Sequence, residues 1–228
     1  MTSNRCHEHY REKAQNPKRA GEIMIVVGLT GGIGCGKSEV SKMLSRAGYT
    51  VLDADKLARE LSVSNAGIVG AIKEEFGENM YDGEGQLKRR ALAQIVFSDR
   101  KKLEKLNGII HPRVIRSVEL ALEERQNQGE HVVFVDAALH YEIKWNEAMD
   151  LMVVVSAPMP LRLQRVMQRD RVDEEAVRQR MAMQLPLEEK VKKAEYVIEN
   201  DGDLKQLQET VHRFIDWLNT RLAAASRT

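Results

Sequence analysis

The sequence predicts an α/β fold in which a five-stranded parallel sheet is flanked by helices. The first observation is a set of five short apolar runs, each typical of a buried strand: residues 25–27, 49–52, 132–136, 151–155 and 196–198. The second is that helical periodicity separates these runs, and strands that alternate with helices form parallel sheets. The third is that a glycine-rich turn and several aspartates directly follow the runs, at the edge where parallel sheets bind ligands.

The first predicted strand leads into a loop with the spacing of a phosphate-binding loop. The pattern G-x-x-x-x-G-K-[ST] is matched by Gly31, Gly32, Ile33, Gly34, Cys35, Gly36, Lys37 and Ser38. In such a loop the backbone N–H groups surround a polyphosphate, the lysine reaches the β- and γ-phosphates, and the hydroxyl binds Mg²⁺. Helical spacing follows the loop, so the phosphates would lie at a helix N-terminus. A strand before and a helix after argue against a chance match, and we predict binding of ATP or GTP.

Aspartates follow the second and third predicted strands. Asp53 and Asp55 would point to the same side if the chain stays extended there, because side chains alternate along a strand. Asp136 ends the third strand, where a carboxylate of a phosphate-loop enzyme holds Mg²⁺ directly or through water. The alternative for Asp136 is a carboxylate that caps a turn.

Helical signals fill the long stretch between the second and third strands, from about residue 56 to about residue 128. This stretch exceeds a simple crossover, so we expect a helical subdomain that covers the phosphate site. Arginines recur in a second helical stretch, at about residues 162–190. Arg162, Arg165 and Arg169 would lie on one helix face. A solvated basic face is the usual explanation, but after a phosphate loop we favour a lid in which Arg165 and Arg169 neutralise ATP phosphates.

Composition limits the classes of partner. The 228 residues carry 35 basic and 34 acidic side chains, and a net charge of +1 gives no general attraction to nucleic acid or membranes. No apolar run reaches the length of about 18 residues expected of a membrane-spanning helix. Two cysteines, Cys6 and Cys35, make no disulfide framework, which is typical of a cytoplasmic protein.

The two ends of the chain differ from the predicted domain, residues 24–222. Residues 1–23 lack apolar periodicity and have no secretory h-region, so we expect a disordered extension. Cys6-His7-Glu8-His9 offers too few ligands for a closed metal site. We predict a last helix with Asp203 as its N-cap, followed by a frayed end at residues 223–228.

The chain resembles the dephospho-coenzyme A kinase family. The resemblance is carried by the loop from Gly28 to Ser38 and above all by Asp53-Ala54-Asp55-Lys56-Leu57-Ala58-Arg59, a complete match to the family element D-A-D-x-x-A-R. Weaker matches extend it from about Met24 to Leu218. It implies a P-loop kinase fold with a helical coenzyme A subdomain and a lid. It also implies phosphorylation of the ribose 3′-hydroxyl of dephospho-CoA by ATP with Mg²⁺, the step that yields coenzyme A.

The resemblance also implies residue roles. Asp55 would be the catalytic aspartate, acting with Lys37 and Arg165. Dephospho-CoA would be bound by Asp53, Arg59, Arg89 and His111. Two alternatives stay open: Asp55 is also placed to N-cap the helix that follows it, with Asp53 as the base, and His111 is equally well explained as a helix-start histidine that packs locally before Pro112.

Two positions depart from the family pattern. Cys35 stands where a small hydroxyl residue is common, and a thiol near Lys37 and a helix N-terminus could be acidified. After the third strand the family shows Pro-Leu-Leu-x-Glu, whereas this chain reads Ala137-Ala138-Leu139-His140-Tyr141-Glu142. If Glu142 takes the family's glutamate position, His140 replaces an apolar residue, and we expect a loop histidine rather than a catalyst.

Three alternative functions stay open. A nucleoside or nucleotide kinase would share the loop, sheet and lid, but not the element at residues 53–59. A GTPase would need an Asn-Lys-x-Asp element, which the sequence lacks, and Asp82-Gly83-Glu84-Gly85 matches D-x-x-G without a preceding strand. A nucleotide-binding module without catalysis is suggested by the altered loop before Glu142.

Overall fold

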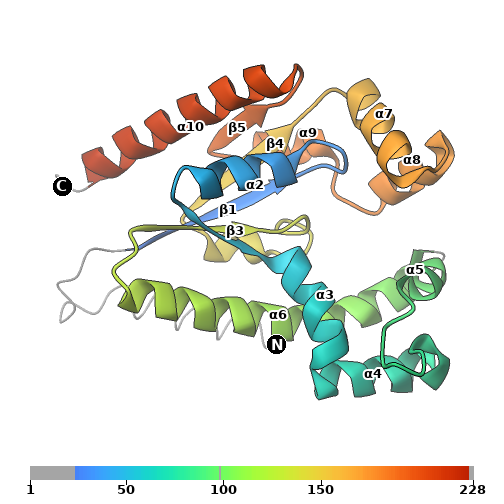
Figure 1. Ribbon diagram of the computed structural model, residues 1–228. Coiled ribbons are helices and arrows are strands. Elements are labelled where there is room, and N and C mark those ends of the chain that lie inside the picture. Colours follow the sequence, from blue (N-terminus) through green and yellow to red (C-terminus); the bar gives the residue numbers. More distant parts are fainter. Residues whose placement is uncertain (1–23, 98, 226–228) are drawn as a thin grey trace. The chain divides into compact units, whose positions relative to one another are not determined.

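Five strands form one sheet in the order β2-β3-β1-β4-β5, which confirms the predicted fold class (Figure 1). The computed structural model describes residues 24–97 and 99–225. β1 pairs in parallel with β3 and with β4, and β4 pairs in parallel with β5. The bounds are β1 (Ile25–Gly31), β2 (Thr50–Asp53), β3 (Val132–Asp136), β4 (Leu151–Ser156) and β5 (Tyr196–Glu199).

β1 is longer than the predicted run of residues 25–27, because it lies at the centre of the sheet and is paired along both edges. Leu29 lies opposite Asp136 of β3, and Gly31 lies opposite Val155 of β4. A side chain at Gly31 would not fit there, since a Cβ would come within 2.7 Å of the Val155 carbonyl oxygen. The sheet therefore runs directly into the glycine-rich loop, and the ends of β1 and β3 lie side by side.

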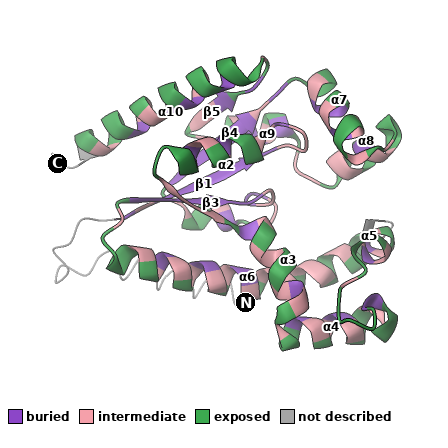
Figure 2. Ribbon diagram, in the orientation of Figure 1, coloured by how far each residue is buried: buried purple, intermediate pink, exposed green. Residues whose placement is uncertain are grey.

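The chain divides into two compact units. The core unit contains the described residues up to Leu52 and from Gln126 onward, and the helical unit is Asp53–Arg125. In the core unit, α2 (Lys37–Arg46) and α10 (Leu204–Ala225) pack against each other and against the strands. The strands β1, β3 and β4 are buried almost throughout, whereas α10 has an exposed outer face (Figure 2).

The last helix begins as the sequence predicts. Asp203 Oδ1 accepts from the Gln206 backbone N–H at 2.9 Å, and Gln206 Oε1 accepts from the Asp203 N–H at 2.8 Å. This reciprocal pair is a capping box. The helix continues to Ala225, past the predicted end of the domain at residue 222, and the rest of the predicted frayed end, residues 226–228, lies outside the described residues.

Four short elements complete the core unit. The loop after β3 contains η2 (Trp145–Ala148), and β4 is followed by α7 (Met159–Asp170), α8 (Glu174–Ala182) and α9 (Leu187–Lys192). A small apolar cluster joins α7 to α8 through Leu163, Val166 and Val177, and Ile33 of the glycine-rich loop packs against it. α7 and the loop after β1 are therefore in contact.

The helical unit has an apolar core of its own. It contains α3 (Ala54–Ser64), α4 (Ala66–Phe76), η1 (Glu78–Met80), α5 (Arg89–Phe97) and α6 (Arg100–Asn127), of which α6 ends just beyond the unit's boundary. Ile68, Ile72, Met80, Tyr81, Leu92 and Val96 form the buried cluster. The Tyr81 hydroxyl donates to the Ser62 carbonyl at 2.7 Å, and so satisfies its polar group inside this core.

Two expectations from the sequence concern residues that the structure does not describe: the extension of residues 1–23 and the Cys6-His7-Glu8-His9 group within it. Over residues 24–97 and 99–225, no helix combines the length and the apolar character needed to cross a bilayer.

Candidate active site

The glycine-rich loop has the backbone of an anion-binding turn. Gly34 and Gly36 adopt left-handed conformations, with φ of 83° and 87°. Gly36 is also the N-cap of α2, and no side chain hydrogen-bonds to the cap. The first N–H groups of α2 have no acceptor within a helix, so they suit a bound phosphate. Both predicted features of the loop, the tight turn and the helix behind it, are present.

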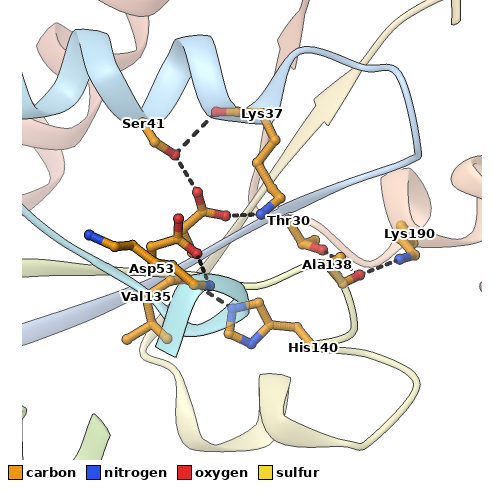
Figure 3. A network of polar contacts seen from close by, with 10 residues as sticks. Thr30, Lys37, Ser41, Asp53, Val135, Ala138, His140 and Lys190 are labelled. Atoms are coloured by element: carbon orange, nitrogen blue, oxygen red, sulfur yellow. Dashed lines mark hydrogen bonds and ion pairs between the residues drawn. The ribbon is translucent and has the colours of Figure 1, made fainter. Parts of the chain in front are cut away.

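Lys37 is held by the carboxylate at the end of β3. Its Nζ donates to Asp136 Oδ1, and Ser41 Oγ donates to Asp136 Oδ2 at 2.5 Å (Figure 3). Asp136 is only 3% exposed, so this ion pair is shielded from solvent. The Lys37 carbonyl oxygen, 3.1 Å from Ser41 Oγ, is a second and more distant acceptor for the same hydroxyl proton. The Lys37 ammonium group, which is predicted to reach the phosphates, is thus oriented before a nucleotide binds. Ser38, the next residue, is exposed.

The three arginines of α7 have different surroundings. Arg165 donates to the carbonyl and the side-chain oxygen of Asn200, at 3.2 and 3.3 Å. Arg169 is exposed and pairs with Asp170 at 2.8 Å. Arg162 is buried and donates from Nε to the Ile33 carbonyl at 3.0 Å. Arg162 therefore contacts the glycine-rich loop directly, although the sequence favoured Arg165 and Arg169.

Charge pairing at the end of α7 shifts two pKa values. The hydrogen bond with Arg169 lowers the pKa of Asp170, and Arg180 of α8 adds to the effect with a contact of 2.9 Å. The same hydrogen bond raises the pKa of Arg169. Arg169 is thus tied to its own helix end in this structure, and its predicted contact with ATP remains a prediction.

Asn200, directly after β5, connects two parts of the site. Its Nδ2 donates to the Cys35 carbonyl at 2.8 Å, while its Oδ1 accepts from Arg165. Its amide fills the space above Gly36, where a Cβ would clash with Nδ2. Sequence reasoning assigned no role to this residue, and the position of a polar residue at the end of a predicted strand was the available signal.

The pKa of the Cys35 thiol is shifted mainly by burial and not by the helix N-terminus. The side chain is fully buried, and burial raises its pKa above the ordinary value, against smaller opposing contributions headed by the charge of Arg162. The suggestion of an acidified thiol was therefore wrong. A thiolate would lose its hydration in this apolar environment, and that loss outweighs the neighbouring positive charge.

The loop after β3 is held by an ion pair whose lysine is buried and whose glutamate is partly exposed. Lys190 of α9 is fully buried and donates to the Ala138 carbonyl at 2.9 Å (Figure 3). It also pairs with Glu142 Oε1 at 2.8 Å. Thr30 of β1 donates to the same Ala138 carbonyl at 3.2 Å. Glu142 also accepts from the Leu185 N–H at 2.8 Å. No local pattern in the sequence distinguishes Lys190 from the exposed lysines near it.

His140 is a structural residue of this loop. It is fully buried, its Nε2 donates to the Val135 carbonyl at 2.8 Å, and its ring lies 5.2 Å from that of Trp145. A histidine in the position of an apolar family residue is thus accommodated by the hydrogen bond to Val135 and an aromatic neighbour. This agrees with the expectation of a loop histidine.

In the helical unit, Asp53 rather than Asp55 caps the helix after β2. Asp53 Oδ1 accepts from the Lys56 N–H at 2.7 Å, and α3 begins at Ala54. The chain is not extended between the two aspartates, so the expected same-side placement does not apply. Asp55 lies in the first turn of α3, where the helix dipole favours its negative charge.

His111 lies inside α6, not at a helix start, because the helix continues through Pro112. Burial lowers its pKa, and the charge of Asp55 partly offsets this, which places the two side chains within electrostatic reach. Burial therefore favours the neutral form of His111. Elsewhere in this unit, Arg89 at the start of α5 donates to the Arg59 carbonyl at 3.1 Å, and both side chains are exposed.

Residues 25–206 match the family model described as dephospho-CoA kinase. A dephospho-CoA kinase of Fusobacterium nucleatum is 38% identical over 193 residues, which cover 85% of this chain and 98% of the relative. One from Salinibacter ruber is 40% identical over 185 residues, covering 81% of this chain and 93% of the relative.

Solved structures show the same similarity. A crystal structure of a Thermus thermophilus protein has a TM-score of 0.73 at 36% identity, and it covers 88% of this chain and 99% of its own. The dephospho-CoA kinase of Campylobacter jejuni has a TM-score of 0.62 at 25% identity and covers 86% of this chain and 98% of its own.

Proposed function

Because the chain belongs to the dephospho-CoA kinase family, we propose that it transfers the γ-phosphoryl group of ATP to the ribose 3′-hydroxyl of dephospho-CoA, the final step of coenzyme A synthesis. The observation that carries the proposal is the Lys37–Asp136 pair at the start of α2, together with the family match across the rest of the chain. Phosphoryl transfer needs positioning and charge neutralisation more than covalent chemistry.

The proposed ATP residues all belong to the core unit. Backbone N–H groups from Gly32 to Ser38 would surround the β- and γ-phosphates, and Lys37 would supply a fixed positive charge. Arg165 and Arg169 would add charge when the segment that carries them closes over the nucleotide. In the present structure Arg165 is held by Asn200, so it would exchange neutral acceptors for a phosphate.

The proposed acceptor residues all belong to the helical unit. Asp55 would accept or orient the proton of the 3′-hydroxyl, and a carboxylate favoured by a helix N-terminus is better at orienting that proton than at holding it. His111 in its neutral form, close to Asp55, would hydrogen-bond to the substrate without adding charge. Arg59 and Arg89, both exposed, would bind its phosphates, and Asp53 would keep α3 in place beside them.

The side chains present fit Mg²⁺. Ser38 offers an exposed hydroxyl, and Asp136 a carboxylate, and Mg²⁺ binds through one or two such oxygens, water and substrate phosphates. Asp136 already accepts from Lys37 and Ser41, so it would hold the ion through water. Bound Mg²⁺ would neutralise charge on the β- and γ-phosphates. We place the reaction in the cytoplasm, in keeping with only two cysteines in 228 residues.

The test is coupled ADP release from ATP and Mg²⁺, with and without dephospho-CoA. We expect turnover that requires both the acceptor and the metal, with ATP preferred over GTP. Adenosine and shikimate are the control acceptors, because nucleoside and shikimate kinases use a phosphate loop with other substrates. Equal turnover with either control would remove the proposed substrate, and ATP binding without turnover of any acceptor would indicate a non-catalytic module.

A further inference from the structure

Arg162 is a buried positive charge without a negative partner. Its exposed fraction is 5%, and no carboxylate pairs with it in the part of the chain that the structure describes. The guanidinium carries five N–H groups, of which only Nε–H has a protein acceptor there, the Ile33 carbonyl at 3.0 Å. Its Nη1 and Nη2 groups have none among these residues. Neither Nη atom is among the described buried polar atoms that lack a partner, so both keep some contact with solvent, from which an anion can reach them.

The guanidinium lies against the phosphate-binding loop. A Cβ added to Gly32 would come within 2.6 Å of Arg162 Nη2 and 2.9 Å of Cζ. A Cβ on Gly34 would come within 2.6 Å of the Arg162 carbonyl oxygen. The absence of side chains at Gly32 and Gly34 is therefore what lets the first turn of α7 approach the loop. Both glycines belong to the part of the motif whose backbone faces a polyphosphate.

The position of Arg162 is fixed by packing. Its neighbours in α7, Leu163 and Val166, are buried in the cluster with Val177 of α8, and Ile33 packs against the same cluster. A long side chain held in this way loses little further conformational entropy when it binds a ligand. Arg165 and Arg169 differ, since Arg165 already donates to Asn200 and Arg169 to Asp170.

We propose that Arg162 binds the terminal phosphates of ATP through Nη1 and Nη2, as a second fixed cation of the loop beside Lys37. The inference rests on the proposed function only in taking ATP as the ligand. An anion between the loop and this guanidinium supplies the acceptors that its N–H groups lack, and a planar guanidinium binds phosphate oxygens in pairs. The side chain is then a catalytic residue that is in place before Arg165 moves.

The test compares Arg162→Gln and Arg162→Lys in the full chain. The control is Arg178→Gln, which removes an exposed arginine of α8 that pairs with Glu174. Affinities for ATP and AMP are measured by calorimetry, and thermal midpoints are measured without nucleotide. We expect Arg162→Gln to weaken ATP binding by about tenfold or more, the scale of a hydrogen bond to a charged group, and AMP binding by less than about twofold. Arg162→Lys should keep more of the ATP affinity, because the charge remains.

Stability separates this role from a purely structural one. Removing a buried, unpaired charge should leave the thermal midpoint of the nucleotide-free protein unchanged or raised relative to the Arg178→Gln control. Unchanged ATP affinity in Arg162→Gln would overturn the proposal. A lowered thermal midpoint together with equal losses of affinity for ATP and AMP would also overturn it. Arg162 would then only support the loop through its hydrogen bond to Ile33. None of these readouts needs dephospho-CoA, so a failed acceptor assay would refute the proposed function and not this inference.

Discussion

Replacing Lys190 with methionine tests whether the ion pair below the loop after β3 holds that loop in place. Methionine fills a similar volume, so the main change is the lost ammonium group. Glu142 Oε1 would keep the Leu185 N–H, but Glu142 Oε2 is buried and already lacks a hydrogen-bond partner. The carboxylate, whose side chain is 17% exposed, would remain mostly shielded from water and uncompensated. Breaking a fully buried pair from one side costs about 3–5 kcal/mol, and this is the upper limit here because Glu142 keeps some contact with water.

A loss of that size is a large share of the stability of an ordinary domain, about 5–15 kcal/mol. We expect urea unfolding, followed by tryptophan fluorescence, to show a much lower midpoint for Lys190→Met with an unchanged slope. Trp145 lies in this loop and should report its loss. Glu142→Gln in the same chain removes the stranded charge, so the double variant should recover most of the stability and show strong coupling between the two sites.

The matched control is Lys192→Met, two residues along α9, where the lysine is exposed and pairs with Glu189 at 2.7 Å. Its unfolding midpoint should stay at that of wild type, because exposed ion pairs contribute little. If Lys190→Met unfolds at the same midpoint as this control, the pair does not hold the loop. Strictly additive losses in the double variant would likewise refute the reasoning.

Four further predictions concern the candidate site. Lys37→Met should lower kcat by roughly a hundredfold or more, as measured by ADP release, and a rate within about threefold of wild type would show that the loop binds something else. Asp55→Asn should fold normally, bind ATP in calorimetry and lose roughly a hundredfold or more in kcat. Asp53→Asn keeps the cap of α3 and should lose less of its kcat. A larger loss of kcat in Asp53→Asn than in Asp55→Asn would exchange the two roles. Arg165→Ala should lower kcat and kcat/KM by similar factors, and a change confined to the KM for ATP would make it an ordinary binding residue. Cys35, with its raised pKa, should be alkylated far more slowly in the native than in the unfolded protein, as followed by peptide mass mapping, and equal rates would contradict its burial.

Local patterns predicted the sheet because each strand is a short apolar run, and a buried parallel strand leaves that signature whatever surrounds it. The phosphate-binding loop was predictable for the same reason, since its glycines, Lys37 and Ser38 are contiguous. Local patterns could not decide between Asp53 and Asp55 as the cap of α3. Either carboxylate suits an N-cap, and the choice depends on where β2 stops pairing.

Contacts between distant segments were not predictable. Asn200 binds the Cys35 carbonyl across 165 positions of sequence, and Arg162 reaches Ile33 across 129. Neither partner carries a local signal, because a backbone carbonyl is available at every residue. The row of arginines pointed to α7, which contacts the loop, but which arginine is buried depends on how α7 packs there. The roles of Arg59, Arg89 and His111 toward dephospho-CoA remain predictions from the family resemblance.

The strand order of the sheet has a consequence for synthesis on the ribosome. β1 leaves the ribosome first among the strands, yet both of its neighbours, β3 and β4, are made only after the whole helical unit. The helical unit has an apolar core built from nearby residues, so it can fold as soon as it emerges. Until residue 132 emerges, the unpaired N–H and C=O groups along both edges of the apolar strand β1 have no neighbour in the sheet and are open to wrong partners. Slower elongation just after the helical unit should therefore increase aggregation of the nascent chain, whereas slower elongation after β4 should not.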